Sequence, residues 1–143
     1  MTSPKRPRDA VVRTVTTVYA GILLTVMVVS AVSGIVDPQQ GAQGFGVPAT
    51  DDAAALYFAV YRDRNLVLAA VGFAFLFLRM WSALAILATA AVTLPLYDML
   101  ALLRADEPVS AGHPLTFAAL VVLAALLWTR VRRAGAVPQV QPA

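Results

Sequence analysis

Long apolar stretches alternate with short polar segments along this chain of 143 residues. A helix needs about 20 apolar residues to cross the roughly 30 Å hydrocarbon layer of a bilayer. Four stretches meet that length, at about residues 11–36, 59–78, 81–103 and 113–133. The second completes a longer helix that starts at Thr50-Asp51-Asp52, because a capping hydroxyl followed by acids suits the positive end of a helix. The pattern predicts an all-α fold, an antiparallel up-down four-helix transmembrane bundle.

Short polar segments connect these stretches and divide the chain. Residues 39–49 are rich in Gly, Gln and Pro, which predicts a loop. A tight turn is expected at Arg79-Met80-Trp81, and a polar loop follows at residues 104–112. The resulting division is a basic cytoplasmic N-terminus at residues 1–10, a membrane domain at 11–133, and a disordered cytoplasmic tail at 134–143.

Charge predicts the orientation of the bundle. Basic residues precede the first stretch, follow the fourth, and include Arg79 between the second and third. Because cytoplasmic loops carry the excess of Lys and Arg, both termini are expected in the cytoplasm, with the protein multi-pass in the cytoplasmic (inner) membrane. The basic start, apolar core and Ala31-Val32-Ser33 also fit a cleavable signal peptide, but the apolar stretch exceeds a usual signal core, which favours a retained span.

Composition agrees with a membrane protein and excludes several site types. The chain is 59% hydrophobic and 13% charged, with a mean hydropathy of +0.74, which is too apolar for an ordinary soluble domain. It has no cysteine and only one histidine, so thiolate and His-rich metal sites are excluded, and no metal or cofactor is expected. The net charge of +3 comes from residues flanking the spans and does not imply nucleic acid.

Two charged groups interrupt the apolar stretches. Asp98 lies in the otherwise uncharged run 81–103, and Arg62-Asp63-Arg64-Asn65 interrupts the preceding run. Charge within a membrane-length segment is costly, so such residues indicate a functional site. At 1.5 Å per residue, both groups lie roughly 24–26 Å from the cytoplasmic turn, near the outer edge of the hydrocarbon layer.

Helical spacing predicts which faces point inward. Small and polar residues form one stripe on the third stretch and one on the second, namely Ala88, Ala91, Pro95 and Asp98, and Ala59, Asp63, Val67, Ala70 and Ala74. We expect Asp98 to contact the Arg62-Asp63 turn through Arg62, beside a cavity open near the outer surface. The candidate polar site comprises Arg62, Asp63, Asn65, Asp98, Tyr97, Tyr57 and Ser33. Ser30 and His113 lie at the same level. The Ser30 hydroxyl is expected to bond to the backbone of its own helix, and His113 is interpreted as a helix-start residue. Arg64 is expected to extend to the lipid headgroups.

Three motifs, RDRNL, LPLYD and HPLTFAALVVLAALL, resemble an uncharacterised family of small bacterial and fungal four-span membrane proteins with a DoxX-like layout. The resemblance covers about residues 11–133. It implies that the family's Arg-Asp or Arg-Asn pair in span two, and its Asp late in span three, correspond to Arg62, Asp63, Asn65 and Asp98. The family often has glycine before its arginine, where this chain has Tyr61. Since the family has no established activity, the resemblance supports architecture rather than function.

Three functions remain open. The favoured one is a binding or accessory role, whose partners are the lipid bilayer and a small lipophilic ligand, or an oligomer or larger complex. The alternative is a membrane-embedded enzyme that uses Asp98 or Asp63 as acid or base, with Arg62 orienting a lipophilic substrate. A small proton-coupled exporter ranks third. Its ionisable group should lie near the membrane midplane, whereas the charges of this chain are expected near the outer edge. The charged residues can also form a buried ion pair that only stabilises the bundle.

Overall fold

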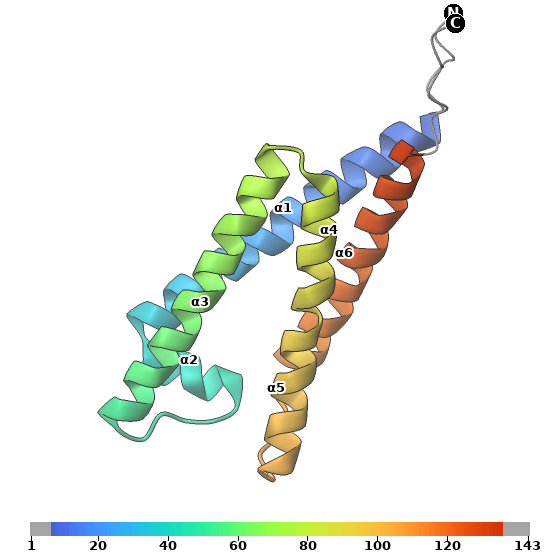
Figure 1. Cartoon of the computed structure of the whole chain (residues 1–143). Helices are drawn as coiled ribbons and strands as arrows, with labels where there is room; N and C mark the ends of the chain where they lie inside the picture. The colour runs from blue at the N-terminus through green and yellow to red at the C-terminus, as the bar shows by residue number, and fades with distance from the viewer. Residues whose placement is uncertain (1–6, 136–143) are drawn as a thin grey trace, which may run out of the picture.

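The computed structural model describes residues 7–135, and this part of the chain contains six helices and no strand. They are α1 (Pro7–Val36), α2 (Pro38–Phe45), α3 (Asp52–Phe77), α4 (Trp81–Ala91), α5 (Thr93–Arg104) and α6 (Gly112–Gly135), arranged as in Figure 1. The all-α prediction is confirmed. Residues 1–6 of the expected basic N-terminus and 136–143 of the expected tail lie outside the described residues.

Three helical segments are long and apolar enough to cross a membrane, which makes this a small membrane protein. They are Ala10–Val36, Trp81–Arg104, which joins α4 and α5, and Gly112–Ala134. Helix α3 has 26 residues, enough to cross, but it carries the adjacent charges Arg62, Asp63 and Arg64 in its middle. The second predicted span, which lies in α3, therefore differs from the other three in charge and not in length.

Helix α2 occupies the segment that was predicted to be a loop, so that prediction is wrong for residues 39–45. The side chain of Asp37 accepts a hydrogen bond from the Gln40 N–H at 3.0 Å, and Pro38 occupies the first turn, where its missing N–H costs nothing. The helix ends at Gly46, whose φ of 118° is accessible to glycine and not to most residues. Because the segment is rich in glycine and glutamine, these residues that begin and end the helix are hard to recognise in the sequence.

The predicted ends of the other helices agree more closely. Asp51 accepts a hydrogen bond from the Ala54 N–H at 2.8 Å and caps α3, with Asp52 in its first turn. The third predicted span is divided at Val92 into α4 and α5. Pro95 explains the division, because it has no N–H to donate to the Ala91 carbonyl.

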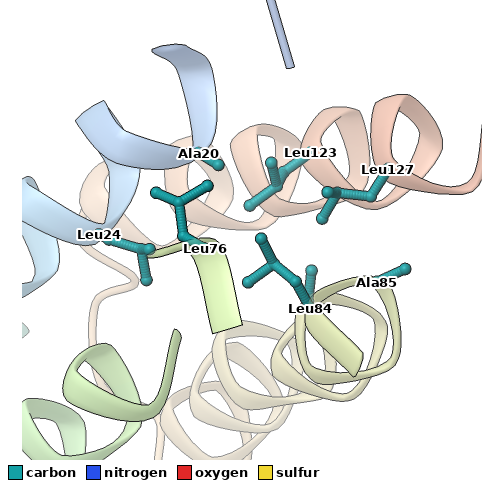
Figure 2. Packing of buried hydrophobic residues seen from close by; sticks show 8 residues of the cluster. Ala20, Leu24, Leu76, Leu84, Ala85, Leu123 and Leu127 are labelled. Atoms are coloured by element: carbon teal, nitrogen blue, oxygen red, sulfur yellow. The ribbon is translucent and has the colours of Figure 1, made fainter. Parts of the chain in front are cut away.

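The apolar core lies toward the end of the bundle that contains the α3–α4 turn. Ala20 and Leu24 of α1 and Leu76 of α3 meet buried residues of α4 and α6, as Figure 2 shows: Leu84, Ala85, Ala88, Leu123 and Leu127. Gly72 lets α1 and α3 approach closely, since a Cβ there would lie 2.5 Å from the Leu24 side chain.

The opposite end of the bundle is built differently. There α3 packs on α1, α5 packs on α6, and α2 packs against α1 and α3. Figure 1 shows α3 diverging from α4 and α5 with distance from the α3–α4 turn, with α2 near the N-terminal part of α3. Phe45, the last residue of α2, reaches His113 at the start of α6, so α2 links the two helix pairs.

Candidate functional site

Residues of all six helices and of the α5–α6 loop line a pocket of about 440 Å³ at this end of the bundle. We call it the polar pocket. Its polar lining side chains are Ser30, Tyr61, Arg62, Asn65, Asp98, Ser110, His113 and Thr116, and the rest of its wall includes Leu23, Met27, Leu94 and Leu120.

Asp98 is the meeting point of three helices in the polar pocket. The Tyr61 hydroxyl of α3 donates a hydrogen bond of 3.1 Å to Asp98 Oδ2. His113 Nδ1 of α6 lies 3.9 Å from the same oxygen. The Asp98 side chain keeps 17% of its surface exposed and that of His113 keeps 9%, so both are largely enclosed while lining the pocket.

The contacts of His113 determine where its protons lie. Its Nε2 is 2.9 Å from the carbonyl oxygen of Phe45, and since that oxygen can only accept, Nε2 carries a proton. In neutral histidine, Nδ1 then faces Asp98 as an acceptor, and the carboxyl group would have to supply the proton between them. In charged histidine, Nδ1 donates toward the carboxylate. In either form, Nδ1 of His113 faces the Asp98 carboxyl group.

Arg62 lies apart from this pair, against α1. Its Nη1 donates to Ser30 Oγ at 3.2 Å, and its guanidinium carbon lies 4.8 Å from the centre of the Phe58 ring. Gly34 makes room for the side chain, because a Cβ there would come within 2.8 Å of Arg62 Cγ. Within residues 7–135, Arg62 forms no ion pair with an acid, and its buried Nε has no hydrogen-bond partner.

Asp98 thus differs from the expectation in its partners. It bonds to Tyr61 and faces His113, and the predicted Arg62–Asp98 ion pair does not form. The predicted inward stripe on α4 and α5 is confirmed, because Ala88 and Pro95 are buried and Asp98 lines the pocket.

The predicted inward stripe on α3 is wrong. Asp63 is exposed, as is Val67, while the buried face of the helix carries Ala55, Phe58, Ala69, Gly72 and Leu76. Of the seven candidate site residues, Arg62, Asn65 and Asp98 line the polar pocket, whereas Asp63, Tyr57, Tyr97 and Ser33 are exposed outside it. Arg64 is exposed, and its position near the headgroups stays a prediction.

Sequence reasoning gave too little weight to four residues of the site. Tyr61 has no predicted role. Ser30 is expected to bond within its own helix, but it accepts a hydrogen bond from Arg62, and His113, expected only to start a helix, faces Asp98. Phe45 fell in the predicted loop. One signal could have indicated His113: it is the only titratable side chain at the predicted outer end of the fourth span.

A family model described as "Domain of unknown function (DUF4267)" matches residues 13–130, most of the chain. This agrees with the expectation of an uncharacterised family. No curated protein and no solved structure matches the chain. The interpretation of the site therefore depends on its own geometry.

Proposed function

This chain belongs to the DUF4267 family, whose function is unknown, and we propose that its polar pocket binds a small lipophilic ligand at the outer side of a four-span bundle. The observation that carries the proposal is the pocket itself. Its volume of about 440 Å³ lies within the usual range for small-molecule sites, roughly 300–1,000 Å³. A cluster that only stabilised the bundle would be closed, with its polar atoms paired within the protein.

The length of α3 supports a fourth span. Its 26 residues extend about 39 Å at 1.5 Å per residue, more than the hydrocarbon layer requires. Arg62 is folded against α1, and Arg64 can extend toward the headgroups from a position near the membrane edge. These charges are therefore compatible with a helix that crosses the membrane.

Contacts at the opposite end support a cytoplasmic location for that end. Arg130 Nη1 of α6 donates to the Arg13 carbonyl and the Thr17 hydroxyl of α1, at 2.9 and 2.8 Å. Its guanidinium carbon lies 3.2 Å from the centre of the Trp81 ring. Basic residues and tryptophan gather there, as they do at cytoplasmic interfaces. The polar pocket, at the other end, would then face outward.

One observation favours an enzyme as the second candidate. Tyr61, Asp98 and His113 place three groups that can carry or accept a proton in contact at the pocket wall. Asp98, as acid or base, could exchange a proton with a bound lipophilic substrate, and His113 lies beside its carboxyl group, 3.9 Å away. Detection of a chemically altered ligand would distinguish this function from simple binding.

The test is native mass spectrometry of the protein purified in mild detergent. We expect an adduct of defined mass on the unmodified protein. Thr116→Trp, which fills the polar pocket from an exposed position of α6, should remove the adduct. Ala118→Trp, exposed on the same helix but outside the pocket, is the matched control and should retain it. A protein without adduct, or an adduct that persists in Thr116→Trp, would contradict ligand binding in this pocket.

A further inference from the structure

A second pocket adjoins the polar pocket and has the opposite character. It measures about 320 Å³, and we call it the apolar pocket. Thr93 is the only residue with a polar side chain among those that line it, and its hydroxyl donates to the Ala90 carbonyl, 2.7 Å away. A molecule in the apolar pocket would therefore find hydrophobic contacts and no free hydrogen-bonding side chain.

The two pockets lie side by side, and four residues line both. Both are lined by Met27 of α1, Ala91 and Leu94 beside the α4–α5 break, and Leu120 of α6. One end of this combined space carries charged groups and the other is apolar. Its shape and polarity match a single-chain amphiphile, with its head in the polar pocket and its hydrocarbon tail in the apolar one.

The charges of the polar pocket indicate the sign of the head group. Asp98 already has Tyr61 and His113 as partners, whereas Arg62 has only the neutral Ser30 hydroxyl and the Phe58 ring among the described contacts. Arg62 is therefore a cation in the pocket wall that has no carboxylate partner among the described residues. An anionic head would balance it, and uncompensated charge is unfavourable in a region of low polarity.

We propose that the ligand is a long-chain fatty acid, whose carboxylate pairs with Arg62 while its alkyl chain occupies the apolar pocket. The inference rests on the proposed binding function and specifies its ligand class. Carboxylate suits this position because guanidinium N–H groups form strong, charge-assisted hydrogen bonds to it. Arg62 is then the residue that selects the head group.

The experiment compares two probes with the same alkyl chain, hexadecanoate and hexadecanol, titrated against the purified protein and followed by native mass spectrometry. Losing a charge-assisted hydrogen bond should weaken binding by roughly tenfold or more, so hexadecanoate should bind that much more tightly. Arg62→Gln should reduce hexadecanoate binding to the level of hexadecanol without changing hexadecanol binding. Arg62→Lys, which retains the charge, should keep part of the preference.

A second pair of variants tests the position of the tail. Leu94 and Leu96 of α5 are similarly exposed, at 40% and 42%, but only Leu94 lines the pockets. Leu94→Trp should weaken the binding of both probes, and Leu96→Trp should leave both unchanged. Equal weakening by the two variants would overturn the tail assignment.

Equal affinity for the two probes in the unmodified protein would overturn the inference, and this comparison does not depend on whether any variant folds. The outcomes also separate the two proposals. If Thr116→Trp abolishes the native adduct but the protein shows no preference for hexadecanoate, the ligand-binding proposal stands and the fatty-acid proposal fails. If neither an adduct nor probe binding is observed, both proposals fail.

Discussion

Asp98 is stabilised by neighbours that leave Arg62 available. In a poorly hydrated site, an unpaired charge costs about 3–5 kcal/mol relative to a paired one. Tyr61 and His113 provide Asp98 with a donor and a proton-sharing partner, whereas Arg62 is held by a hydroxyl and an aromatic ring. This separation of the two charges is what makes the polar pocket a binding site in our account, because a closed Arg62–Asp98 pair would satisfy both residues internally.

A double-mutant cycle can measure this pairing. Tyr61→Phe removes the donor to Asp98 and should lower the free energy of unfolding by about 0.5–2 kcal/mol, the range measured for side-chain hydrogen bonds between membrane helices. Tyr61→Phe combined with Asp98→Asn should cost less than the sum of the two single changes. Arg62→Gln combined with Asp98→Asn should show a smaller coupling, because these two side chains form no hydrogen bond or ion pair with each other.

The control for this cycle is Tyr57→Phe on the same helix. Tyr57 is 76% exposed and lies outside the polar pocket, so removal of its hydroxyl should leave the stability unchanged. If the double-mutant cycle couples Asp98 to Arg62 and not to Tyr61, then Arg62, and not Tyr61, is the partner of Asp98.

At this scale, the sequence indicated which charges matter but not what they touch. Depth follows from counting residues, so Asp98 and Arg62 were correctly placed at one level. The rotation of a helix about its axis depends on its packing partners. On α3, the buried face follows Phe58 and Ala69 rather than Ala59 and Ala70, a shift of about one position, and this places Asp63 on the outside.

Among the elements, α2 has the largest effect on the site. It packs on α1 and α3 and presents Phe45 to His113 through a carbonyl contact and an edge-to-face ring contact 4.6 Å between centres. Its start and end signals, Asp37-Pro38 and Gly46, are present in the sequence. An eight-residue helix rich in glycine is too short and too weakly patterned to be distinguished from a loop before its packing is known.

Two glycines of α2 provide a matched test of that packing. A Cβ at Gly41 would lie 2.7 Å from the Phe58 ring and 3.0 Å from the Gly34 backbone, whereas a Cβ at Gly44 would meet no atom within 4 Å. Gly41→Ala should destabilise the protein by about 1–3 kcal/mol, the usual cost of overpacking. Gly44→Ala should cause no loss, and should add about 0.5–1 kcal/mol through helix propensity.

Thermal unfolding in detergent, with both variants measured under the same conditions, checks this prediction. A normal melting temperature for Gly41→Ala would mean that α2 does not rest on Gly34 and Phe58. The position of Phe45 beside His113 would then lose its support.

For the whole molecule, the two ends are built differently. The apolar core joins α1, α3, α4 and α6 at one end, the polar pocket lies at the other, and the apolar pocket lies between them, against core residues such as Leu84 and Leu123. The sequence predicted the long helices and most of their ends, because apolar length and capping residues are local signals. It could not predict the divergence of α3 from α5, since this depends on contacts between distant segments.

The account depends on α3 crossing the membrane, because only then does the polar pocket lie at the outer end of a four-span bundle. The chain has no cysteine, so single introduced cysteines report their side unambiguously. Gln40, Met80, Glu107 and Ala134 are exposed in the structure and line neither the polar nor the apolar pocket.

The decisive measurement is labelling of these single-cysteine variants with an impermeant thiol reagent on intact cells. Gln40→Cys and Glu107→Cys should be labelled, whereas Met80→Cys and Ala134→Cys should react only after the membrane is opened. Residues 40 and 80 flank α3, so this pair tests the crossing directly. Labelling of positions 40 and 80 from the same side would show that α3 does not cross, and would contradict an outward-facing pocket within a four-span bundle.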